Sequence, residues 1–307
     1  MQKIALKNIV LLLSFIALTE HGLYAQSSFE NSPFYKHLVT VGGSIGAAHY
    51  LGDLSPKMNF RFIRPSLQAY AKKTFFPYDL SLKLNYNLSL LSAVDKFSRD
   101  SMQIIRNLDF SSTVHEFSLS MQAGIVKFRR YNYTYSIYMS FGIGAFIFNP
   151  YTFDDQKKVY LRDLGTEGQF SYLPSKPAPY SLWGQSYPLG IGIQSNKKST
   201  KTWHIEFIYR FTNTGYLDDV FSKYAGFESF QPSGDSYNSV LASKLQNRSE
   251  FIDFGIRGTS RGNGKTDHFF TLNFGMDIQL WRYIYKYRTK YKRIRINQKI
   301  SPDDEVF

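Results

Sequence analysis

The chain has 307 residues, a formal net charge of +13 and no cysteine, so a disulfide framework, a thiol nucleophile and a thiolate metal site are excluded. Aromatic residues make up 17% of the chain, yet beyond the N-terminal segment no apolar run is long enough for a membrane helix. A membrane protein with this sequence would have to be a β-barrel, because a closed barrel is the only other structure that satisfies its own backbone in lipid.

The N-terminal segment has the pattern of a signal peptide. Lys3 and Lys7 precede an apolar run over residues 9–18, and Ala25 stands before Gln26. Ten apolar residues are too few to span a bilayer as a helix, which needs about 20. We therefore predict a signal peptide over residues 1–25 and a mature chain beginning at Gln26. An uncleaved anchor is the alternative.

Residues 79–90, DLSLKLNYNLSL, alternate strictly between polar and apolar side chains. This period of two indicates a strand with one dry and one wet face. Seven further stretches share the pattern, and most of the eight are longer than the usual five or six residues of globular strands. The predicted strands are 39–50, 65–72, 80–90, 116–125, 133–147, 183–193, 203–212 and 270–280.

The connections between these strands alternate in length. Short turns lie at 76–78, around 129–131 and at 196–200, whereas the other connections, 51–63, 93–111, 149–182 and 213–267, are long. This layout is typical of outer-membrane barrels. We predict an all-β fold over residues 26–284, an eight-stranded antiparallel up-and-down transmembrane β-barrel with long extracellular loops. A soluble lipid carrier and a soluble sandwich with an aromatic core are the alternatives.

The aromatic residues near the predicted strand ends agree with a membrane barrel. Phe128, Tyr133 and Trp203 lie by the short turns and Trp183 lies by a long loop, as interfacial girdles should.

If the Leu-rich face of 80–90 meets lipid, the polar face lines the lumen. Eight strands enclose a lumen that side chains just fill, and buried charges must pair. We therefore expect ion pairs that plug the lumen, with a proton or ion path as the alternative. The candidates are Lys83, Glu206 and Asp277 near the short turns, and Glu116 and Arg210 farther from them.

No arrangement in the sequence indicates catalysis, a cofactor or a metal. The six histidines do not cluster, and only His204 points inward in the middle of a strand. A loop-borne histidine beside Ser or Asp could serve a hydrolase, but no nucleophile elbow is present. The segment 165–169 lacks the Lys of a phosphate loop. We interpret it as a turn motif whose glycines adopt positive φ.

Five short sequence motifs occur in order along the chain: HYLGDLSP (49–56), RNLDFSS (106–112), FGIGAFIFNP (141–150), LRDLGTEGQ (161–169) and YLDDV (216–220). Together they resemble the PorG-like family of Bacteroidota outer-membrane barrels, associated with type IX secretion and gliding. The resemblance covers residues 39–281. The loop residues that carry it are Asp53, Gly165, Thr166, Glu167, Gly168, Gln169, Asp218 and Asp219.

The resemblance implies a structural component of the outer membrane and no catalytic residues. It also implies a periplasmic partner, a ring built from a peptidoglycan-linked lipoprotein and its companion protein. Family members are expected to end close to the last strand, whereas this chain continues to residue 307. A paralogue with a different partner is therefore an alternative.

The C-terminal segment concentrates the basic charge. Residues 282–299 hold eight basic residues and no acid, so nucleic-acid binding by the whole domain is not indicated. Residues 285–307 would form a basic periplasmic tail that either anchors to anionic lipid or docks an acidic partner. The candidate contacts are Arg282, Lys286, Arg288, Lys290, Lys292, Arg293 and Arg295.

The leading hypothesis is a non-enzymatic outer-membrane barrel that anchors an envelope assembly. A surface barrel whose long loops bind a ligand or another cell is the second hypothesis. A small-solute channel is the third.

Overall fold

The computed structural model describes residues 37–75, 79–131, 133–171, 176–196, 201–230, 237–251 and 253–280. The predicted signal peptide, the start of the mature chain and the basic tail lie outside these residues. The part described belongs to one compact unit that begins at His37.

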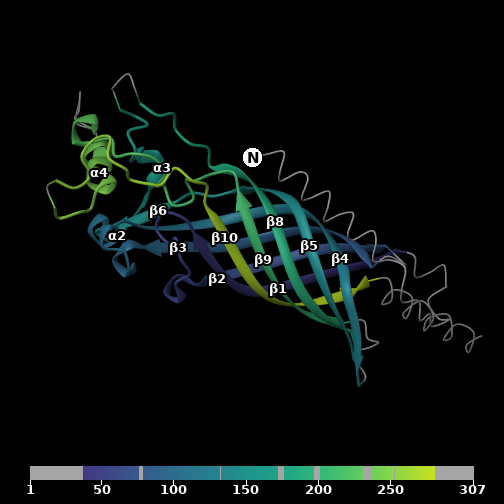
Figure 1. Cartoon of the computed structure of the whole chain (residues 1–307). Helices are drawn as coiled ribbons and strands as arrows, with labels where there is room; N and C mark the ends of the chain where they lie inside the picture. Colours follow the sequence, from purple (N-terminus) through teal and green to yellow (C-terminus); the bar gives the residue numbers. More distant parts are fainter. Residues whose placement is uncertain are drawn as a thin grey trace, which may run out of the picture. The chain divides into compact units, whose positions relative to one another are not determined.

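Eight long antiparallel strands form a closed ring in the order β3-β2-β1-β10-β9-β8-β5-β4 (Figure 1). Pairing between β3 and β4, from Leu80↔Ala123 to Val94↔Asp109, closes it and leaves no free edge in the ring. All eight predicted strands are confirmed. Their bounds are β1 His37–Leu51, β2 Arg64–Phe75, β3 Leu80–Val94, β4 Asp109–Arg130, β5 Tyr133–Ile147, β8 Trp183–Asn196, β9 Lys201–Thr212 and β10 His268–Gln279.

The faces of β3 are as predicted. Leu84 is 60% exposed on the outside, whereas Lys83 and Asn85 are buried inside. The same division runs around the ring, so the barrel is apolar outside and polar inside. A soluble lipid carrier has the opposite arrangement, and the fold is therefore that of a transmembrane barrel. Exposed apolar side chains of the outer belt include Ile45, Leu67, Leu84, Phe117, Leu119, Phe141, Ile143, Ile191, Ile205, Leu272 and Phe274.

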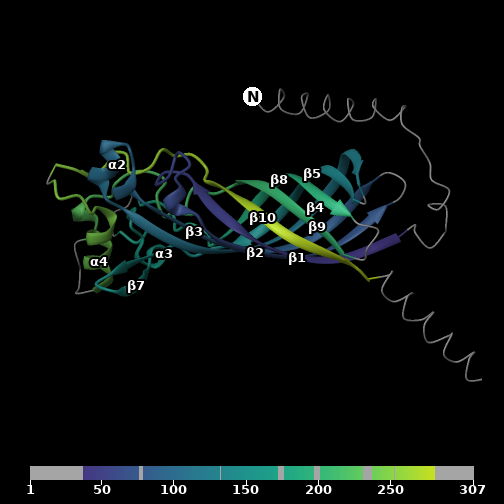
Figure 2. The same cartoon turned by 90° about the horizontal axis from the view of Figure 1, so that it is seen from below.

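The four long connections contain secondary structure of their own and gather at one end of the barrel (Figures 1 and 2). We call the described residues of 52–63, 95–108, 148–182 and 213–267 the cap. None of the described helices is long and apolar enough to cross a membrane. The elements of the cap are η2 Phe60–Phe62, η3 Asp95–Phe97, α2 Ser101–Arg106, β6 Tyr151–Asp154, β7 Lys157–Tyr160, α3 Leu161–Leu164, η4 Phe227–Phe230 and α4 Tyr237–Gln246.

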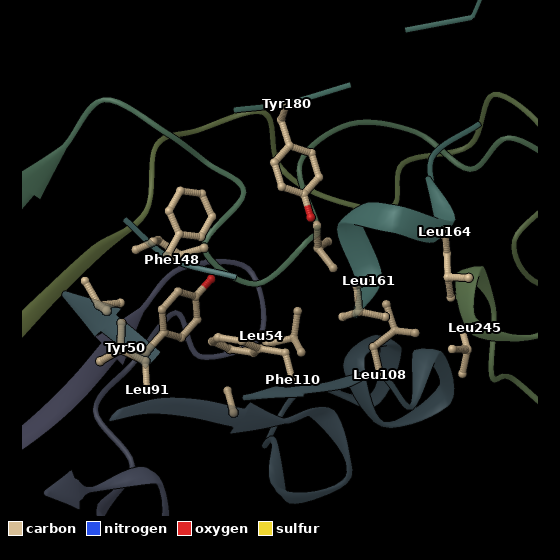
Figure 3. Packing of buried hydrophobic residues seen from close by; sticks show 14 of the residues in the cluster. Tyr50, Leu54, Leu91, Leu108, Phe110, Phe148, Leu161, Leu164, Tyr180 and Leu245 are labelled. Carbon is tan, nitrogen blue, oxygen red and sulfur yellow. The ribbon is translucent and has the colours of Figure 1, made fainter. Parts of the chain in front are cut away.

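The cap has a hydrophobic core, which the strand pattern did not predict (Figure 3). Strands β3 and β4 continue past the outer belt into it, and β6 joins β4 through the pair Ser111↔Tyr151. The long loops are therefore a packed layer over the barrel. Its buried side chains include Tyr50, Leu54, Leu91, Leu108, Phe110, Phe148, Leu161, Leu164, Tyr180, Leu217, Leu241, Leu245 and Phe269.

Candidate functional site

Two ion pairs lie in the lumen toward the short turns. Lys83 Nζ donates to Glu206 Oε2 at 2.8 Å, and Lys72 Nζ donates to Asp277 Oδ2 at 2.9 Å. The hydroxyl of Tyr70 also donates to Asp277. Lys83 Nζ lies 4.2 Å from the centre of the Tyr70 ring, in the position of a cation–π contact. These side chains come from β2, β3, β9 and β10. The Lys83–Glu206 pair joins opposite sides of the ring, and the Lys72–Asp277 pair joins the two strands that flank β1.

A third ion pair lies nearer the cap. Arg210 Nε donates to Glu116 Oε2 at 2.5 Å, and both side chains are 0% exposed. Ser186 Oγ donates to the other oxygen of Glu116 at 2.6 Å, and Arg210 Nη1 donates to Thr271 Oγ1 at 2.9 Å. The guanidinium lies 5.1 Å from the centre of the Phe269 ring. Charges so fully buried are tolerated only when they are paired and hydrogen-bonded. Both conditions hold here, although Arg210 Nη2 has no hydrogen-bond partner among the described residues.

The structure thus places all five predicted lumen residues inside the barrel and gives each an oppositely charged partner. Lys83 pairs with Glu206 and Arg210 with Glu116, while Asp277 pairs with Lys72, which was not among the candidates. In the sequence, Lys72 lies on the polar row of β2 that alternates with the outward apolar residues, and this position indicated that it faces the lumen. Its partner depends on ring closure, because β1 separates β2 from β10.

The residues of the five sequence motifs meet in a second cluster, within the cap. Glu167 is its centre. Oε1 accepts hydrogen bonds from the amides of Phe221 at 2.8 Å and Ser222 at 2.9 Å. Oε2 accepts from Ser222 Oγ at 2.6 Å and from the Tyr216 hydroxyl at 3.3 Å. Arg261 Nη1 lies 3.4 Å from Oε1. One carboxylate therefore joins the β5–β8 connection to the β9–β10 connection.

Asp219 makes a parallel link between the same two connections. Its side chain accepts hydrogen bonds from Thr166 Oγ1 and from the Tyr180 hydroxyl, the latter at 2.7 Å. Arg261 Nη2 lies 3.5 Å from Oδ2, and Nη1 donates to the carbonyl of Asp219. Complete burial raises the pKa of Asp219 to about 6 even though Arg261 opposes the shift.

Asp218 and Asp267 lie on either side of the Tyr50 hydroxyl. Its oxygen is 2.5 Å from Asp218 Oδ2 and 2.8 Å from Asp267 Oδ1. A phenol has one proton, so two hydrogen bonds require a second proton on one of the carboxyls. Burial and mutual repulsion among the acids raise the pKa of both Asp218 and Asp267, with Asp53 the largest charge acting on Asp218. Both raised pKa values favour a protonated carboxyl beside the Tyr50 hydroxyl.

Asp53 and Arg106 bring the remaining connections into this cluster. Asp53 Oδ1 accepts the amide of Asn263 at 3.0 Å, and burial raises the pKa of Asp53 to about 6. Arg106 donates to both oxygens of Asp95, at 2.7 and 2.8 Å, and to the carbonyls of Asp53 and Arg261 at 3.0 and 2.7 Å. A single guanidinium thus contacts three of the four connections.

The glycines of 165–169 act as the turn interpretation requires. Gly165 ends α3 with φ +63° and Gly168 has φ +81°, both in the left-handed region that favours glycine. Gln169 Oε1 accepts the amide of Glu167 at 3.0 Å, which holds the turn that presents Glu167.

We call the polar set of the cap, together with Tyr50 at the end of β1, the cap network. It contains Tyr50, Asp53, Asp95, Arg106, Thr166, Glu167, Tyr180, Asp218, Asp219, Arg261 and Asp267. Among its basic members, Arg106 lies within one of the five sequence motifs, whereas no sequence pattern indicated Arg261. The arrangement cross-links the loops. The described residues also hold no group of three His, Asp or Glu side chains suited to a metal ion.

The basic tail residues Arg282, Lys286, Arg288, Lys290, Lys292, Arg293 and Arg295 lie outside the described residues. Their predicted contacts remain predictions.

No protein-family model and no curated protein sequence matches this chain. Solved structures that match part of this chain include Ail, the attachment invasion locus protein of Yersinia pestis, in complex with the heparin analogue sucrose octasulfate. That match has 9% identity, covers 80% of this chain and 99% of that chain, and has a TM-score of 0.36.

Neisserial surface protein A (NspA) matches at 7% identity, over 80% of this chain and 97% of that chain, with a TM-score of 0.35. The N-terminal β-barrel domain of Pseudomonas aeruginosa OprF matches at 9% identity, over 78% and 97% of the two chains, with a TM-score of 0.31. The fold assignment here rests on the closed ring and its apolar outer belt.

Proposed function

We propose that this protein is a sealed, non-enzymatic barrel of the outer membrane that acts as a structural anchor for an envelope assembly. The observation that carries the proposal is the blocked barrel: three ion pairs fill the lumen and the packed cap covers one end. A barrel closed in this way does not serve as a diffusion channel. Its role would be to hold rigid binding surfaces for other proteins in the membrane.

The assembly that we propose is the type IX secretion or gliding machinery. Support comes from the resemblance to PorG-like barrels, since residues of the sequence motifs from Asp53 to Asp219 contact one another in one buried network. The partner would be the periplasmic ring lipoprotein with its companion protein. With eight strands and a signal peptide, the chain would leave the barrel on the periplasmic side, where the basic tail would meet this partner.

Affinity purification of the detergent-solubilised protein tests this function. The full chain should retain the ring proteins, and a chain lacking residues 286–307 should lose them while its barrel still folds. The matched control keeps the tail length but replaces Tyr283, Tyr285, Tyr287 and Tyr291 by Ser, which separates charge from aromatic contacts. Full retention by the truncated chain would contradict the tail as a docking segment, and absence of ring proteins from every sample would contradict the assembly.

A loop-binding function is the second candidate, and a cavity in the cap favours it. This open cavity of about 660 Å³ lies between the β5–β8 and β9–β10 connections and is bordered by the exposed cations Lys176, Lys223 and Arg257. A Lys223→Ala, Arg257→Ala protein that loses adhesion of whole cells to a surface, while still retaining ring proteins, would favour this function.

A further inference from the structure

A group of exposed basic and apolar side chains lies where the cap meets the barrel wall. We call it the rim patch. Its members come from the β1–β2 connection with the start of β2, and from the β3–β4 connection. They are Lys57, Met58, Phe60, Arg61, Arg64, Lys96, Phe97 and Arg99, all exposed.

Specific contacts hold the two connections of the rim patch together. Asn59 Nδ2 donates to the carbonyl of Phe97 at 3.4 Å, and the rings of Phe62 and Phe97 are 6.5 Å apart. The guanidinium of Arg61 lies 4.8 Å from the centre of the Phe97 ring, and Arg64 Nη1 donates to the Arg61 carbonyl at 3.5 Å. The basic and apolar groups therefore form one surface.

The positive charge of this surface is not neutralised within the part of the chain that the structure describes. None of its five basic side chains takes part in an ion pair there. The neighbouring acids are engaged elsewhere: Asp95 binds Arg106, Asp53 accepts the amide of Asn263, and Asp100 caps α2 by accepting the amide of Met102. By contrast, Arg106, Lys244 and Arg248 of the cap all have acidic partners.

The rim patch lies close to the end of the lipid-facing belt. Arg64 opens β2, and the outward Leu67 follows three residues later, a rise of roughly 10 Å along the strand. In Figures 1 and 2 the segment between β1 and β2 projects from the side of the barrel wall at its cap end. Phe60 is 76% exposed, which is costly in water but favourable at a membrane interface.

We propose that the rim patch binds the phosphorylated headgroup of a glycolipid in the membrane leaflet on the cap side. Arg61, Arg64 and the nearby lysines would contact the phosphates, because guanidinium and ammonium groups are the donors that recognise this anion. Phe60, Phe97 and Met58 would lie at the boundary between headgroups and acyl chains. The proposal rests on the proposed placement of the barrel in the outer membrane.

Lipid retention by purified protein tests the proposal. The protein, folded in zwitterionic detergent micelles, is titrated with diphosphoryl lipid A, and bound lipid is measured by native mass spectrometry. The rim variant carries Lys57→Gln, Arg61→Gln, Arg64→Gln and Lys96→Gln. Since a basic side chain at an anionic surface contributes about 1 kcal/mol, we expect the apparent Kd to rise by at least about tenfold.

The matched control removes the same charge elsewhere on the cap, through Lys157→Gln, Lys223→Gln, Arg257→Gln and Lys265→Gln, and should shift the Kd less than about twofold. Equal losses in both variants, or no loss in the rim variant, would overturn the proposal. So would equal binding of a dephosphorylated lipid A, or full competition by millimolar inorganic phosphate, which would indicate a free-anion site. Failure to fold in lipid vesicles of any composition would instead count against the membrane placement itself.

Discussion

Arg210 and Glu116 are 94 residues apart in the chain, and their side chains meet in the lumen with Nε and Oε2 2.5 Å apart. Breaking this pair should be costly because one buried charge remains. We expect Arg210→Met to lower the free energy of unfolding by about 3–5 kcal/mol, measured by urea denaturation in lipid vesicles.

The double variant Arg210→Met, Glu116→Leu is the control for this prediction. Replacing both charges by apolar groups removes the uncompensated carboxylate, so the double variant should recover most of the stability. Additive losses in the double variant would show that the pair is not coupled.

The outer face of β3 should reject charge in a depth-dependent way. Leu84→Arg places a cation toward lipid near the middle of the alternating stretch 80–90 and should cost about 2–4 kcal/mol of folding free energy. Leu80→Arg, at the short-turn end of the same strand, should cost about 0–1 kcal/mol. Heat-modifiable migration and urea midpoints measure both variants. Equal losses of folding free energy would show that the bilayer does not lie at the predicted height on the barrel.

The cap should be more stable at mildly acidic pH than at neutral pH. Asp218 and Asp267 have pKa values raised by burial, and those of Asp53 and Asp219 are raised to about 6. A carboxyl whose pKa is raised on folding contributes its full stabilisation of the cap below the pKa of the unfolded chain, about 3.9. This contribution is lost as pH rises through the pKa of the folded state.

Hydrogen exchange of the amides in 213–222, corrected for intrinsic rates, should therefore show greater protection at pH 5 than at pH 7.5. Asp218→Asn mimics the neutral carboxyl beside Tyr50 and should flatten this dependence. An unchanged slope in the variant would show that the titrating proton is located elsewhere.

Glu167 should stabilise the cap without being needed for the barrel. Its carboxylate accepts hydrogen bonds from two amides and two hydroxyls and lies beside the buried Arg261. Glu167→Ala therefore leaves several partly buried donors and one buried guanidinium without this partner. We expect a loss of about 3–5 kcal/mol in cap stability, seen as rapid proteolysis of the loops while heat-modifiable migration persists. Asp163→Ala, at an exposed position of α3, is the matched control and should stay protease-resistant.

The blocked lumen predicts very low conductance. Purified protein in a planar bilayer should show no conductance steps of porin size, because Lys72, Lys83 and Arg210 are each held by an acidic partner within the lumen. Arg210→Ala together with Glu116→Ala should permit small, infrequent openings at most. Large steady conductance in the unmodified protein would contradict the structural role and favour a channel.

The sequence by itself determined the strands and their faces. Side chains alternate across a strand whatever it pairs with, so the inward positions of Lys83 and Glu206 and the outward position of Leu84 follow from local parity. Loop lengths determined the up-and-down topology, since a short turn can join only adjacent antiparallel strands. The turn glycines at 165 and 168 were readable for the same local reason.

Only the tertiary structure decided which of these residues meet. Asp277 pairs with Lys72 because the ring closes with a particular register between β10, β1 and β2, and no local pattern encodes register around a closed sheet. The cap was missed for a related reason: its short helices and strands are stabilised by contacts between distant loops, such as Glu167 with Arg261, and period-two alternation does not record such contacts.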